Sequence, residues 1–108
     1  MATTIPASET MDARKTKVLV RYTVGANMNN EQYDETISRL EQSGDWPADG
    51  LDFHVAFRAK GNFRVSEIWD SREQFEAFGE RLMPVLADAG IEFSGDPEVY
   101  EAHSVTTR

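Results

Sequence analysis

The hydrophobic and polar positions follow the periods of β-strands in three parts of the chain. Residues 17–24 (KVLVRYTV) are rich in β-branched residues and apolar on both faces, which predicts a central strand. Residues 51–59 (LDFHVAFRA) alternate between two faces, and residues 62–70 (NFRVSEIWD) follow after two turn residues, Lys60 and Gly61. This spacing predicts a β-hairpin.

Helical periods occur between and after these strands. Asn29 or Asn30 can cap a first helix, whose apolar positions recur until Gly44. Ser71 can cap a second helix, which we expect Pro84 to kink or restart. The apolar positions of the two helices are Tyr33, Ile37 and Leu40, then Phe75, Phe78, Leu82, Leu86 and Ala89. A last strand is predicted over 97–105.

The order of these elements is βαββαβ, which predicts an α+β, ferredoxin-like fold with one four-stranded antiparallel sheet. Strands 17–24 and 62–70 are expected at the centre, parallel to each other and joined by right-handed crossovers. The other two strands would form the edges. Residues 17–108 then make a single domain, and residues 1–16, rich in Thr, Ala, Ser and charge, are expected to be a flexible tail.

Composition excludes several classes of protein. The 11 basic and 19 acidic residues give a net charge of -8, which disfavours nucleic acid and anionic membranes as partners. Cysteine is absent, so disulfides, thiolate nucleophiles and Cys-ligated zinc are excluded. No apolar run approaches the roughly 18 residues of a membrane span, and the N-terminal residues do not resemble a signal peptide. We expect a cytoplasmic location.

The predicted sheet is apolar on both faces, although two helices can cover only one. Val18, Val20 and Tyr22 would point to one side and Leu19 to the other. Large residues of the hairpin also fall on both sides. A second copy of the chain, packed sheet to sheet, is the simplest cover, so we expect a homodimer.

The hairpin brings together the clearest candidate site. A two-residue turn pairs Ala59 with Asn62, which places His54 opposite Glu67 and Asp52 opposite Trp69. A three-residue turn would instead move His54 opposite Ile68. If the first register holds, His54 and Glu67 lie side by side on one face, with Trp69 beside them.

A carboxylate beside an imidazole favours the charged imidazolium and fixes its tautomer, so His54 and Glu67 could together remove a proton from a phenol or an acidic C–H group. Tyr22 and Trp69 could stack on a flat substrate, and His103, on the last strand, could contact it. The structural alternatives are that His54 is a satisfied core or interface residue and that Glu67 pairs with Arg21 or Arg64.

Two further possibilities concern Tyr33 and metal binding. Tyr33 is expected in the core, with its hydroxyl near the cleft. Two histidines on different strands, without a third ligand at metal spacing, make only a weak case for a metal site, and no phosphate loop or Ser-His-Asp order is present.

The run Glu67-Ile68-Trp69-Asp70-Ser71, followed by a helix with Phe75 and Phe78, resembles the dimeric α/β-barrel superfamily and, more narrowly, its antibiotic biosynthesis monooxygenase-like domains. The resemblance covers residues 17 to 105. It implies dimerisation through the sheets and a ligand cleft between sheet and helices of one subunit. Some members of that superfamily are cofactor-free oxygenases that act on polycyclic aromatic phenols, others degrade haem, and many have no known activity.

The haem-degrading group uses a histidine on the second helix and an asparagine on the first strand. Residues 72–89 contain no histidine and residues 17–24 no asparagine, so haem is disfavoured and no cofactor is expected. Two hypotheses then remain: a monooxygenase-like enzyme acting on a small aromatic substrate, and a non-catalytic dimer that binds a small molecule or only itself. A third is a subunit that needs a different partner chain.

Overall fold

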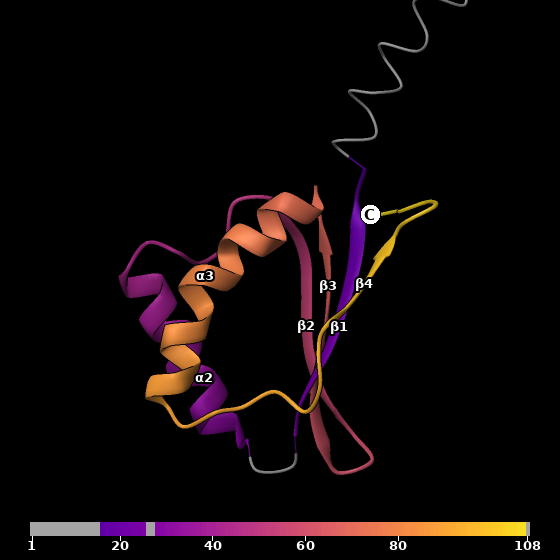
Figure 1. Cartoon of the computed structure of the whole chain (residues 1–108). Helices are drawn as coiled ribbons and strands as arrows, with labels where there is room; N and C mark the ends of the chain where they lie inside the picture. Colours follow the sequence, from indigo (N-terminus) through magenta and orange to yellow (C-terminus); the bar gives the residue numbers. More distant parts are fainter. Residues whose placement is uncertain (1–15, 26–27, 108) are drawn as a thin grey trace, which may run out of the picture.

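The computed structural model describes residues 16–25 and 28–107, which form a four-stranded antiparallel sheet with two helices on one face (Figure 1). The sheet order is β2-β3-β1-β4. The bounds are β1 Val18–Gly25, α2 Asn30–Gln42, β2 Leu51–Ala59, β3 Asn62–Trp69, α3 Arg72–Asp88 and β4 Glu98–Glu101. The predicted ferredoxin-like fold, with β1 and β3 at the centre, is confirmed.

Three details differ from the sequence prediction. β1 and β3 are antiparallel and not parallel, because β3 reverses direction after β2 in a tight hairpin. β4 ends at Glu101, so His103 lies beyond the strand. Helix α3 continues across Pro84 and does not restart there. Of the predicted tail, residues 1–15 lie outside the described residues.

The turn between β2 and β3 sets the register of the site. Lys60 and Gly61 have φ values of 53° and 81°, as a two-residue hairpin turn requires. Ala59 therefore pairs with Asn62, and His54 pairs with Glu67, as predicted. The three-residue alternative is excluded.

The register shifts once, near the start of β2. Leu51 pairs with Trp69 and Phe53 with Ile68, so Asp52 is the extra residue of a β-bulge. The predicted pair of Asp52 and Trp69 is therefore wrong. The bulge turns Leu51 toward the helices, although simple alternation placed it on the same face as Phe53.

Ion pairs hold the bulged end of the sheet. Lys17 donates to Asp52 and, at 2.6 Å, to Asp70, so it joins the chain before β1 to the end of β3. Both hydrogen bonds raise the pKa of the Lys17 ammonium above its usual range, that to Asp52 more than that to Asp70. Lysine already carries its charge at neutral pH, so the two ion pairs fix the local geometry around Lys17 and leave its charge as it is.

The two faces of the sheet have different surroundings. The helix-covered face contains buried residues of two packed clusters: Val18, Val20, Leu40, Trp69 and Phe78, then Val24, Met28, Phe63, Leu86 and Ile91. The opposite face is left uncovered by the helices (Figure 1). It exposes Phe53 and Tyr100 at 50% and Val55 and Phe57 at 37%.

Neither helix in the described part of the chain is long and apolar enough to cross a membrane.

Candidate functional site

Glu67 is a carboxylate in the middle of the sheet with 1% of its side chain exposed. Three donors surround it. Trp69 Nε1 donates to Oε1 at 2.9 Å, whereas His54 Nδ1 and the Tyr22 hydroxyl lie 2.6 Å and 3.3 Å from Oε2. An ionised carboxylate only accepts hydrogen bonds, so this arrangement suits the charged form of Glu67. The donors offset the cost of removing the charge from water.

His54 uses both of its ring nitrogens. Nδ1 lies beside Glu67, and Nε2 is 2.7 Å from the Tyr33 hydroxyl of α2. The His54 side chain is 12% exposed. The three residues therefore form a line, Tyr33–His54–Glu67, from the first helix through the edge strand to the sheet centre.

The partly buried phenols of Tyr22 and Tyr33 keep their protons at neutral pH. Burial, followed by the charge of Glu67, raises the pKa of Tyr22 well above its ordinary value of 10.0. The same two causes raise the pKa of Tyr33. His54 Nδ1 donates to Glu67, because an ionised carboxylate can only accept, and the Tyr33 hydroxyl pairs with Nε2. When the His54 ring is neutral, its proton is therefore on Nδ1, and Nε2 is the atom that can take up a proton from Tyr33.

Aromatic rings hold the line of residues in place. The Trp46 ring meets His54 edge-on, with centroids 4.9 Å apart and planes at 84°. The Tyr33 ring lies 5.3 Å from Phe63, which Arg58 covers at 5.2 Å. Edge-on and tilted arrangements of this kind are the favourable ones for aromatic pairs.

A small cavity of about 30 Å³ lies between the sheet and the helices. His54, Tyr22 and Tyr33 line it, together with Phe78 and Leu82 of α3. Glu67 and Trp69 are not among its described lining residues. This volume has room for a water molecule or a diatomic gas and none for an aromatic ring.

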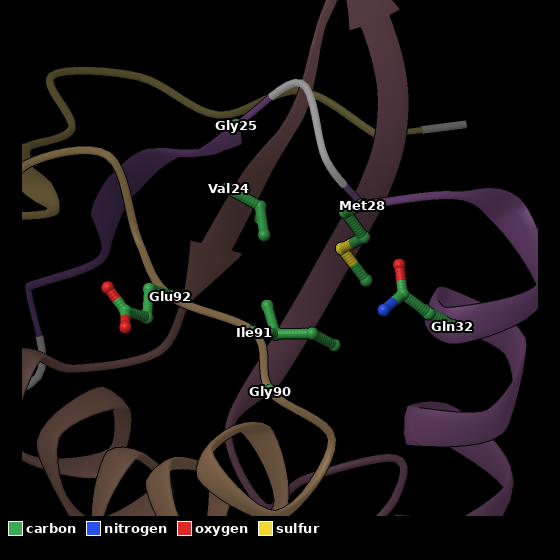
Figure 2. A pocket seen from close by; sticks show the side chains of 7 residues that line it. All are labelled: Val24, Gly25, Met28, Gln32, Gly90, Ile91 and Glu92. Carbon is green, nitrogen blue, oxygen red and sulfur yellow. The ribbon is translucent and has the colours of Figure 1, made fainter.

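A larger pocket of about 290 Å³ opens at the end of β1, where Figure 2 shows its lining side chains. It is lined by Val24, Gly25, Met28, Gln32, Gly90, Ile91 and Glu92. Val24 and Met28 line both spaces, so the pocket and the cavity share a wall.

The predicted site residues are only partly brought together. His54, Glu67 and Tyr22 meet as described. Trp69 has no exposed surface, packs on Phe75 and Phe78, and reaches the site only through its hydrogen bond to Glu67, so it does not line the cavity as we expected.

The remaining candidates lie elsewhere. His103 is exposed beyond β4, away from the lining residues of the cavity. Arg21 and Arg64 lie on the opposite face of the sheet from Glu67. Neither therefore forms the ion pair with Glu67 that was the structural alternative.

Two site residues were missed or undervalued. Tyr33 was expected in the core with its hydroxyl near the cleft, and this hydroxyl completes the line to His54, a contact that the sequence did not name. Trp46 lies in the loop after α2, where sequence period carries no information. The available signal was a large aromatic residue in a stretch otherwise made of Asp, Pro, Ala and Gly, which must pack somewhere.

Among the described residues, no group of three or more His, Asp or Glu side chains could hold a metal ion.

No protein-family model and no curated protein matches the chain. Solved structures match its fold. A candidate antibiotic biosynthesis monooxygenase from Chloroflexus aurantiacus J-10-fl superposes with a TM-score of 0.58 at 14% identity, over 85% of this chain and 98% of that one. A mutant form of SnoaB, a cofactor-independent oxygenase from Streptomyces nogalater, gives 0.55 at 12% identity, over 89% and 100%.

A conserved protein of unknown function from Bacteroides thetaiotaomicron VPI-5482, described as a candidate oxidoreductase, gives a TM-score of 0.54 at 13% identity, over 82% of this chain and 99% of that one. Identities this low establish a shared fold and no more. The chain therefore has the ferredoxin-like fold of the antibiotic biosynthesis monooxygenase-like proteins, and its activity has to be argued from its own site.

The tyrosine titration tests the electrostatics of the site. Glu67→Gln should lower the pKa of Tyr22 and Tyr33, because it removes a nearby negative charge, while burial keeps the pKa of Tyr22 above 10.0. Tyr100, whose pKa is raised by Glu98, should be unaffected and is the internal control. Phenolate absorbance against pH, with Tyr→Phe variants for assignment, measures this. Unchanged titration of Tyr22 and Tyr33 would contradict the described network.

The same shifts predict how stability depends on pH. A phenol whose folded-state pKa is raised holds its proton more tightly in the folded protein. Its contribution is fully present below the unfolded-state pKa and is lost as pH rises from there through the folded-state pKa. The free energy of unfolding should therefore fall above about pH 10, and less steeply in Glu67→Gln.

Proposed function

We propose that the protein is a cofactor-independent, monooxygenase-like enzyme that acts on a small aromatic substrate. The observation that carries the proposal is the hydrogen-bonded line Tyr33–His54–Glu67, whose end borders a cavity between sheet and helices. The shared fold with SnoaB, itself a cofactor-independent oxygenase, supports the same class. A cytoplasmic location is the accompanying expectation from the sequence.

Proton transfer is the step that these residues can perform. Both nitrogens of His54 are occupied, so a substrate meets the Tyr33 hydroxyl first. An acidic substrate O–H or C–H gives its proton to the Tyr33 oxygen as Tyr33 passes its own proton to His54 Nε2. The product is an imidazolium that Glu67 stabilises, together with a substrate anion.

The anion then supplies electrons to dioxygen. For an activated CH₂ group, the overall change is CH₂ plus O₂ to C=O plus H₂O, so one oxygen atom enters the product and the other leaves as water. The chain's contribution is to create and hold the anion in an apolar space, where an uncompensated charge reacts more readily than it does in water.

The second candidate is a non-catalytic dimeric module that binds a small molecule or only itself. The size of the inner cavity favours it, because only about 30 Å³ remains between the sheet and Phe78, Leu82 and Leu86 of α3. Under this hypothesis the buried network only stabilises the sheet. The two candidates differ in whether the removal of Tyr33 or Glu67 changes a reaction or only changes stability.

We also propose a homodimer formed through the uncovered face of the sheet. Phe53, Phe57 and Tyr100 are large apolar or aromatic residues that this face leaves at least one-third exposed. Arg64 lies on the same face, and its Nε is buried without a hydrogen-bond partner among the described residues. A second copy would cover the rings and could bring an acceptor to Arg64.

Activity tests the enzyme proposal. With labelled dioxygen and a panel of flat aromatic phenols, the wild type should incorporate one labelled oxygen atom per product. Glu67→Gln and Tyr33→Phe should each lower turnover about a hundredfold or more, because each interrupts base catalysis. Tyr100→Phe changes an exposed tyrosine and should leave turnover unchanged.

Circular dichroism should show all three variants folded, with Glu67→Gln less stable by about 1–3 kcal/mol. If every phenol in the panel is inert with the wild type, the module hypothesis replaces the enzyme. If the variants lose stability without losing turnover, the line Tyr33–His54–Glu67 is structural and does not carry the reaction.

Sedimentation tests the dimer. The wild type should be dimeric at micromolar concentration. Phe53→Lys should raise the dimer dissociation constant about a hundredfold or more, because it buries an unpaired charge in the interface. Met83→Lys is the matched control, since Met83 is also 50% exposed but lies on α3. A wild type that sediments as a monomer rejects the interface.

A further inference from the structure

We propose that Met28 divides the ligand site and that a single-ring aromatic ligand, held by the side-chain amide of Gln32, reaches Tyr33 and His54 only by displacing the Met28 side chain. The inference rests on the proposed function for its reaction, but it concerns binding and can be measured without turnover.

The position of Met28 between the two spaces is the first observation. The outer pocket of about 290 Å³ opens to solvent, whereas the inner cavity of about 30 Å³ borders Tyr33 and His54. Met28 and Val24 line both. Figure 2 shows Met28 facing Ile91 across the outer pocket, and both side chains are largely buried, at 6% and 7% exposed.

Of the two residues that line both spaces, Met28 has the more adaptable side chain. Val24 is β-branched and fixed to a strand, so it has one strongly preferred rotamer. The Met28 carbonyl accepts a hydrogen bond from Arg58 at 3.1 Å, and the next residue is the N-cap of α2, so the backbone is held. Methionine has three rotatable side-chain bonds and a polarisable thioether, which adapts to an incoming ring.

Gln32 supplies the polar contact. Its Oε1 accepts from the Asn29 backbone N–H at 3.0 Å in the capping box of α2. The oxygen is thereby occupied, and the amide nitrogen faces Met28 and Ile91 across the pocket (Figure 2). A ligand oxygen that accepts a hydrogen bond can therefore be held here, while the ring lies against Val24 and Ile91.

The volume of the outer pocket limits which class of ligand can bind. A pocket of this volume is at the lower end of the usual range for small-molecule sites, so it suits one ring and not a polycyclic system. Displacing Met28 joins the inner cavity to it and brings a phenolic O–H within reach of Tyr33. Met28 then limits the size of the ring that reaches the base.

Two isosteric probes test the assignment to Gln32. 4-Methoxyphenol carries an ether oxygen where 4-ethylphenol carries a CH₂ group. The wild type should bind 4-methoxyphenol about threefold more tightly or better. Gln32→Glu preserves the capping box but replaces the donor by an acceptor, so this preference should disappear or reverse. Equal preference in wild type and Gln32→Glu overturns the role of Gln32.

Methionine variants test the division of the site by calorimetry with the same two probes. Met28→Ala should tighten binding of both about tenfold, since no side chain has to be displaced. Met28→Leu keeps the volume but is stiffer, and should weaken both. Met83→Ala alters an exposed methionine of α3 and should change neither.

Nuclear magnetic resonance completes the test by reporting the Tyr33 and His54 rings, whose signals should shift when the probe binds. Affinities unaltered in both Met28 variants, or a bound probe that leaves these signals unmoved, overturns the proposal. If Met28→Ala is too unstable to fold, the probe affinities of Met28→Leu and the Tyr33 and His54 ring signals test the proposal without it. If the binding results hold while no variant consumes oxygen, the proposed reaction fails and the divided site stands.

Discussion

The buried charge of Glu67 is the constraint on which the rest of the structure depends. A carboxylate with 1% exposure must be surrounded by donors, and the fold brings them from three strands: Tyr22 from β1, His54 from β2 and Trp69 from β3 itself. Tyr33 of α2 then binds the far side of His54. One charge thus fixes the relative positions of the sheet and the first helix, and the removal of any donor leaves part of it unsatisfied.

The same constraint shapes what the site can do. Because Glu67 occupies Nδ1 of His54, the basic nitrogen points toward Tyr33, and the phenol becomes the group that a ligand meets. The raised pKa of Tyr33 keeps its hydroxyl protonated at neutral pH. Tyr33 therefore gives up this proton only as it accepts one from a ligand. Close packing by Trp46 and Phe78 leaves only a small space there, so any ligand larger than a diatomic gas must enlarge it. One small domain can therefore combine the rigid line Tyr33–His54–Glu67 with the adaptable entrance that we propose at Met28.

The sequence predicted much of this arrangement because local signals were strong. The Lys60–Gly61 turn determined the register, and the register placed His54 beside Glu67. The bulge at Asp52 was not predictable, since Lys17 and Asp70, which hold it, are distant in the sequence. The helical period identifies which residues of a helix face the sheet but not their hydrogen bonds. The Tyr33 hydroxyl could therefore be expected near the cleft, whereas its partner His54 could not be named. The end of β4 was overestimated because a β-like composition continues past the last paired residue, Glu101.

The position of the proton on the neutral His54 ring depends on the whole network around Glu67 and can be measured by nuclear magnetic resonance. The chain has two histidines, and His103 is exposed, so nitrogen resonances of the pair can be assigned with one variant. In the neutral ring, the account predicts that His54 carries its proton on Nδ1, donated to Glu67, with Nε2 unprotonated and accepting from Tyr33. His103 should show the averaged signals of a solvent-exposed imidazole. A His54 ring with its proton on Nε2, or one that averages as His103 does, would contradict the account.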